Sequence, residues 1–229
     1  IPAVAADAST MLLNLTATSA FNATVSASGS YTTQVAAAVV TAFTAFTSSP
    51  NPPEPGTVVT YSVTLNNTGS VSGDSVVLTN LIPSRMTYNS GTMTLNGVAQ
   101  TDASDGDSAN FNVTTSNAIT LSLGTIGLTD TITVTFQAIV NVALPAGTTV
   151  ENQATVAYTT GGNPVSQTSN TVKFIVASAP SLTITAVNGS SQLANPGDTS
   201  TFTLTIVNSG NATDVIDLTY SSTNGLIYS

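Results

Sequence analysis

The chain has 229 residues, of which 41% are hydrophobic and only 6% charged, and eleven acidic residues against two basic ones give a net charge of −9. This apolar content is ample for a packed core, whereas the shortage of Lys and Arg excludes nucleic acid and anionic membranes as partners, because both need clustered cations. Cysteine and histidine are absent, which rules out disulfides, thiol chemistry and most transition-metal sites.

An N-terminal extension, residues 1–37, precedes the first regular domain that the pattern predicts. It holds one strong strand candidate, Met11–Ala17, and one weaker candidate, Asn22–Ala27. No run of apolar residues in the chain is long enough for a membrane-spanning helix. We therefore expect the extension to supply strands and not a membrane anchor.

Residues 38–177 are predicted to form an antiparallel sandwich. Apolar and polar residues alternate with the period of two that is typical of half-buried strands, and Thr, Val and Ile are enriched there. Clusters of Pro, Gly and Asn separate the runs, as in a sandwich of short strands, and no amphipathic helix is indicated. The expected strands are Val59–Leu65, Ile119–Leu123, Ile132–Ala138, Val150–Tyr158 and Val172–Val176.

Part of this domain recurs near the end of the chain. Residues 55–69 align without a gap on residues 196–210, beyond a short linker at 178–181, so the chain contains an internal repeat. The second copy, residues 182–229, lacks counterparts of the later strands and is predicted to be an incomplete sandwich. Its uncovered apolar residues define a candidate acceptor face, formed by Phe202, Leu204, Ile206, Val215 and Leu218.

Five signatures occur in order within the first domain. They are the Pro-Gly-x-x-Val-Thr-Tyr run that opens residues 55–69, then Leu81-Ile82-Pro83, Leu123-Gly124-Thr125-Ile126, Asn152-Gln153-Ala154-Thr155-Val156 and Ser169-Asn170-Thr171-Val172. With these signatures, residues 40–177 resemble the bacterial and archaeal surface-protein repeat known as domain of unknown function eleven, and residues 182–229 resemble a partial second copy. The resemblance implies an Ig-like sandwich in a surface or secreted protein, and it implies no catalytic residues.

The only dense acidic cluster lies between a turn and a strand candidate, at Asp102, Asp105 and Asp107. Carboxylates on a glycine-containing loop suit calcium, so these three are candidate calcium ligands; a solvated acidic loop is the plainer alternative. The other acids are scattered, and the usual general base and thiol nucleophile are missing. We therefore expect neither an enzyme nor any other cofactor.

Six Asn-x-Ser/Thr sequons permit N-glycosylation, which is about the number that chance produces in a chain so rich in Ser and Thr. A sugar on a donated strand would need an outward-facing position. The candidate sites are Asn14, Asn22, Asn66, Asn112, Asn188 and Asn211.

Spare strands at the front of the chain and an incomplete sandwich at its back predict a head-to-tail homopolymer. The extension of one copy would donate a strand to the half-domain of the next, burying Leu13, Leu15 and Ala17. The chain would then be a structural subunit of an extracellular filament at the cell surface. Three alternatives stay open: a truncated second domain, an extension that folds back within its own molecule, and an adhesin or other carbohydrate- or protein-binding module excised from a larger surface protein.

Overall fold

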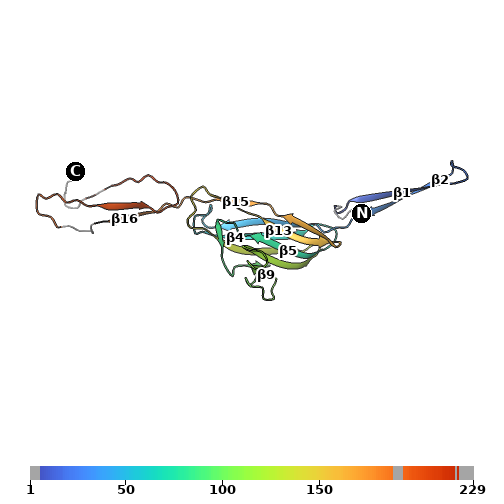
Figure 1. The fold of residues 1–229 in the computed structure, drawn as a ribbon, viewed down its shortest axis with the longest axis horizontal. Helices are drawn as coiled ribbons and strands as arrows, with labels where there is room; N and C mark the ends of the chain where they lie inside the picture. The colour runs from blue at the N-terminus through green and yellow to red at the C-terminus, as the bar shows by residue number, and fades with distance from the viewer. Residues whose placement is uncertain (1–5, 188–192, 220, 222–229) are drawn as a thin grey trace.

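The computed structural model describes residues 6–187, 193–219 and 221, and within them every helix or strand element is a β-strand. Figure 1 shows three parts along the long axis: a hairpin at the N-terminal end, a central sandwich, and a second hairpin at the C-terminal end. The predicted all-β class with an Ig-like antiparallel sandwich is confirmed. The described residues contain no helix that is long and apolar enough to cross a membrane.

The central sandwich has two main antiparallel sheets and one small two-stranded sheet. One main sheet has the order β14-β13-β5-β10-β9, built from β5 (Gly73–Leu81), β9 (Ala109–Phe111), β10 (Ala118–Ile126), β13 (Ala154–Thr160) and β14 (Asn163–Thr168). The other has the order β3-β4-β11-β7-β8 with β6 also paired to β11, built from β3 (Val40–Ser48), β4 (Val58–Asn67), β6 (Met86–Tyr88), β7 (Thr94–Leu95), β8 (Val98–Ala99) and β11 (Thr131–Val140). The small sheet pairs β12 (Thr149–Asn152) with β15 (Val172–Ile175).

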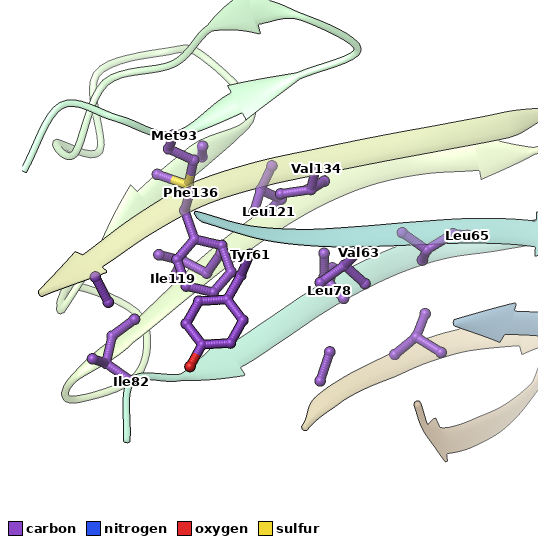
Figure 2. Packing of buried hydrophobic residues seen from close by; sticks show 14 of the residues in the cluster. Tyr61, Val63, Leu65, Leu78, Ile82, Met93, Ile119, Leu121, Val134 and Phe136 are labelled. Carbon is purple, nitrogen blue, oxygen red and sulfur yellow. The ribbon is translucent and has the colours of Figure 1, made fainter. Parts of the chain in front are cut away.

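The hydrophobic core lies between the two main sheets because alternate side chains of each strand point inward. On β4 every second residue from Val59 to Leu65 is buried. The rings of Tyr61 and Phe136 stack with centroids 5.2 Å apart, and Figure 2 shows them among aliphatic side chains of neighbouring strands. The Tyr61 hydroxyl donates to the sulfur of Met86 at 3.1 Å, and burial raises the pKa of Tyr61 far above its ordinary value. The sandwich thus has one continuous hydrophobic core.

One expected strand is divided in the structure. The run Val150–Tyr158 forms β12 and β13, which belong to different sheets. At the crossing, Asn152 and Asn80 exchange two buried side-chain hydrogen bonds of 2.9 and 2.7 Å. The prediction of a single strand was wrong: the run changes sheets at Gln153, next to the point where the buried Asn152 and Asn80 amides satisfy each other's hydrogen-bonding groups.

The N-terminal extension forms a two-stranded hairpin, β1 (Thr10–Thr18) with β2 (Ser26–Gln34). The strong strand candidate is confirmed, but the weaker candidate at Asn22–Ala27 falls mostly in the turn. There the amide of Val25 donates to the carbonyl of Asn22 at 2.9 Å, and the amide of Thr24 donates to the Asn22 side chain at 3.0 Å. The actual second strand is mostly Ser, Thr and Gly, so cross-strand pairing defines it and apolar periodicity does not.

Candidate functional site

The C-terminal hairpin reproduces the first hairpin of the sandwich. It pairs β16 (Leu182–Ala186) with β17 (Leu204–Asn208), which are the repeat equivalents of β3 and β4. The side-chain Nδ2 of Asn67 donates to the carbonyl of Val71 at 2.8 Å, and Nδ2 of the equivalent Asn208 donates to the carbonyl of Ala212 at 2.9 Å. The second copy therefore begins to fold in the same way as the first.

The two copies differ in what covers their apolar face. In the sandwich, Tyr61 and Val63 are 1% and 0% exposed, whereas the aligned Phe202 and Leu204 are 58% and 57% exposed. The pairing register of β16 and β17 places Leu182, Ile184 and Ala186 on the same face as Leu204 and Ile206. Directly opposed residues of an antiparallel pair point to the same side of the sheet. We call this set, with Phe202, the acceptor face; Leu182, Ile184 and Ala186 belong to it although the sequence-based set omitted them. Phe202 lies just before β17, where the hydrogen bond from the amide of Val187 to the carbonyl of Thr203 continues the pairing.

Two residues of the predicted acceptor set lie outside β16 and β17. Val215 and Leu218 are strongly exposed and belong to no strand. They are three residues apart, so in a regular strand they would point to opposite sides. The strand pairing therefore places Leu204 and Ile206 on one face, with Phe202 just before β17, and it does not include Val215 or Leu218.

The N-terminal hairpin also carries one uncovered apolar face. Leu13 and Leu15, which are 61% and 70% exposed, share this face with Met11 and Ala17 on β1 and with Tyr31, which lies opposite Leu13 on β2. The opposite face carries Leu12, Asn14 and Thr16 against Ser and Thr. The predicted donor residues thus lie on a single face of a ribbon, and we call that face the donor face. Tyr31 was not predicted, since a lone aromatic residue among Ser and Thr gives no periodic signal.

Both hairpins are nearly free of charge, although the chain as a whole is acidic. No charged residue occurs between Asp7 and Glu54, and the C-terminal hairpin with its turns has only Asp198 between Lys173 and Asp214. Copies of a chain with net charge −9 repel one another. End-to-end approach through the two hairpins would bring the fewest like charges together.

Asp7 joins the base of the N-terminal hairpin to the sandwich. Its Oδ1 accepts hydrogen bonds from the hydroxyl of Ser70 and from the amide of Ala37, the latter at 2.7 Å. The Ser70 hydrogen bond, followed by that of Ala37, holds the pKa of Asp7 below its ordinary value. The hairpin is therefore connected to the sandwich by side-chain contacts as well as by the chain itself.

Asn211 occupies the corresponding position where the sandwich meets the C-terminal hairpin. Its Oδ1 accepts from the amide of Ala179 at 2.7 Å, and its Nδ2 donates to the carbonyl of Ala177 at 2.9 Å. The main-chain carbonyl of Asn211 accepts from the amide of Ala146 at 2.9 Å. Asn211 thus spans the joint, a role that its sequon does not reveal.

Replacing Asn211 with alanine is expected to lower the exchange protection of the Ala179 amide about tenfold, because that amide loses its acceptor. The Asn211→Asp variant keeps an acceptor oxygen and should restore most of this protection. Hydrogen exchange followed by NMR measures both variants. Equal protection of Ala179 in the wild type and in Asn211→Ala would contradict this role.

The three candidate calcium ligands bond to different partners. Asp102 accepts from the hydroxyl of Tyr88 at 2.7 Å and from the amide of Gly91 at 2.8 Å. Asp107 accepts hydrogen bonds from the backbone amides of Thr101 and Ala109, and these bonds lower the pKa of Asp107. Asp105 accepts a hydrogen bond from the Thr101 hydroxyl at 2.9 Å. Among the described residues, no three acidic side chains are grouped to hold a metal ion. The calcium site stays a prediction from sequence, without support from this geometry.

The sequons fall in different surroundings. Asn14 is exposed on the face of β1 opposite Leu13, where a sugar would leave the donor face free. Asn22 and Asn112 are exposed in turns, and Asn66 is half-buried on β4. A sugar on Asn211 would replace one of the two Nδ2 hydrogens that donate to the carbonyls of Ala177 and Leu144. Asn188 lies outside the described residues.

No family model matches the chain, and no curated protein matches it. The resemblance to domain of unknown function eleven therefore stays a prediction. Among solved structures, BcpA, the major pilin subunit of Bacillus cereus, is 10% identical to this chain and has a TM-score of 0.49. The match covers 87% of this chain and 63% of BcpA. The T6 backbone pilin of serotype M6 Streptococcus pyogenes is 15% identical with a TM-score of 0.42 over 67% of this chain and 38% of that one. BslA, a bacterial hydrophobin, is 19% identical with a TM-score of 0.40 over 60% of this chain and 93% of that one.

This chain therefore spans less than two thirds of the length of the Bacillus cereus pilin. Because these identities are low and the TM-scores lie below 0.5, the similarities carry no argument about what this chain does.

Proposed function

We propose that this chain is a structural, non-enzymatic subunit of an extracellular filament at the cell surface. The N-terminal hairpin of one copy would complete the C-terminal half-domain of the next. One observation carries the proposal: the apolar face that is buried in the first copy of the repeat is exposed in the second, at Phe202 and Leu204. A second apolar face, around Leu13 and Leu15, is exposed at the other end of the molecule.

Energetics support pairing of the two ends. An isolated two-stranded hairpin is marginally stable in water and usually needs a hydrophobic partner. Each apolar side chain that becomes buried contributes about 1.5 to 3 kcal/mol. The two hairpins lie at opposite ends of the long axis (Figure 1), so contact within one molecule would require a large rearrangement. A contact between different surfaces of successive copies need not close, and it then builds a filament.

Electron microscopy of the full chain and of a variant lacking residues 1–34 tests this proposal. We expect filaments from the full chain and none from the variant, because the variant has lost the donor face. Folding of the variant is checked by its circular dichroism and thermal unfolding, since the sandwich core contains no residue of β1 or β2. Monomers from both proteins would contradict the proposal.

The second candidate function is a binding module, such as an adhesin, within a longer surface protein. It is favoured by the way β17 reproduces β4, since further strands of the same chain would cover the acceptor face as they do in the sandwich. Such a module should stay monomeric and should lose its C-terminal hairpin first on proteolysis. The electron microscopy experiment therefore distinguishes the two functions.

A further inference from the structure

The donor face has a gap at its centre. Gly29 lies in the middle of β2, directly opposite Leu15 and between Ala27 and Tyr31 on the same face. Pairing of β1 with β2 is continuous through this position, so Gly29 marks no bulge. It also has no positive φ that would require glycine, and a Cβ built there meets no atom within 4 Å. Nothing in the described residues, 6–187, 193–219 and 221, explains a glycine at this point.

Glycine weakens the interior of a strand because it adds backbone entropy to the unfolded chain and no side chain to the sheet. Apart from bulges and bends, glycine within a strand often marks a site where another group approaches the backbone closely. At Gly29 the approach would come from outside the molecule, since the space above it is open. On the same face, Leu15 lies opposite Gly29 and Tyr31 lies two residues further along β2; we call this position, where a side chain is missing beside apolar neighbours, the notch.

The acceptor face carries a side chain that suits such a notch. Phe202 is its largest residue and is exposed, whereas the equivalent Tyr61 is buried against Phe136 in the sandwich. Face-to-face packing of the hairpins would cover Phe202 and Leu15 together. Adding β1 to the edge of β17 would instead satisfy backbone groups that water already solvates and would leave both apolar faces exposed. Burial therefore favours packing of face on face.

We propose that the donor face of one copy packs on the acceptor face of a second copy, with Phe202 seated in the notch at Gly29. This inference rests on the proposed function and specifies its contact. The donor is then a two-stranded ribbon that covers a sheet, in place of a single strand inserted at an edge. The absence of a side chain at position 29 is what admits the aromatic ring.

The test compares Gly29→Val with Ser28→Val, a matched change on the opposite face of the same strand. Both variants add a β-branched residue, which suits a strand. We expect Ser28→Val to polymerise like the wild type and Gly29→Val to need at least a tenfold higher protein concentration, measured by sedimentation and electron microscopy. Exchange protection of the Leu15 amide shows that the hairpin still forms. The double variant Gly29→Val with Phe202→Ala should polymerise better than Gly29→Val alone.

The outcomes separate the two proposals. A wild-type chain that stays monomeric overturns the proposed function and the notch with it. Filaments that form equally well from the wild type and from Gly29→Val overturn the notch alone. Filaments from the wild type with no gain in the double variant overturn the assignment of Phe202 as the residue in the notch.

Discussion

Replacing Tyr61 with alanine is expected to destabilise the central sandwich by about 3 to 5 kcal/mol, the usual loss for a buried aromatic residue. The same replacement at Phe202, its repeat equivalent, should change the unfolding free energy of the monomeric sandwich by less than about 0.5 kcal/mol. The reason is burial, since Tyr61 stacks on Phe136 inside the core while Phe202 is exposed on the hairpin. Urea unfolding followed by circular dichroism measures both values.

Tyr61→Phe serves as the control, because it keeps the ring in the core and removes only the hydroxyl that donates to Met86. It should therefore cost much less than Tyr61→Ala. If Phe202→Ala destabilised the monomer as strongly as Tyr61→Ala, the acceptor face would be covered within a single molecule. That result would contradict the proposed joining of separate copies.

Introducing aspartate at both Leu13 and Leu15 is expected to raise the protein concentration needed for assembly by roughly a hundredfold or more. Two side chains that would each contribute about 1.5 to 3 kcal/mol on burial are replaced by charges, and about 1.4 kcal/mol corresponds to a factor of ten. The change also brings negative charge to an uncharged hairpin of an acidic chain. Sedimentation of polymer over a series of protein concentrations gives the threshold.

The matched control places aspartate at Asn14 and Thr16, which lie on the opposite face of the same strand. It adds the same charge to the same hairpin but leaves the donor face unchanged, so assembly should be affected much less. Equal loss of assembly in both double variants would show that net charge, and not the apolar face, controls polymerisation. The assignment of the donor face would then be wrong.

Much of the sandwich could be predicted from sequence because its strands are half-buried. The alternation in residues 59–65 and 132–138 reports which side of each strand meets the core, and the structure places β4 and β11 there as neighbours. The second strand of the N-terminal hairpin escaped prediction because its residues are mostly Ser, Thr and Gly. Such a segment has no apolar alternation to detect, and only pairing with β1 defines it as a strand.

Some residues of the candidate sites could likewise be predicted from sequence, and others could not. The internal repeat identified Phe202, Leu204 and Ile206, because they align with Tyr61, Val63 and Leu65, which form the core-facing side of β4. It could not place Val215 and Leu218 on that face, since their orientation depends on a strand that the structure does not form there. Asn211 and Asp7 also escaped prediction, because their hydrogen bonds reach residues distant in sequence such as Ala177 and Ser70.

By itself, the sequence determined the all-β class, the sandwich and its repeat, because short-range alternation and aligned residues record local burial. The tertiary structure alone decided that the N-terminal extension is a ribbon with one apolar face, that β12 and β13 belong to different sheets, and that the two hairpins lie at opposite ends of the molecule. These features depend on pairing between distant segments. Such pairing is governed by backbone hydrogen bonds that nearly every residue type can make.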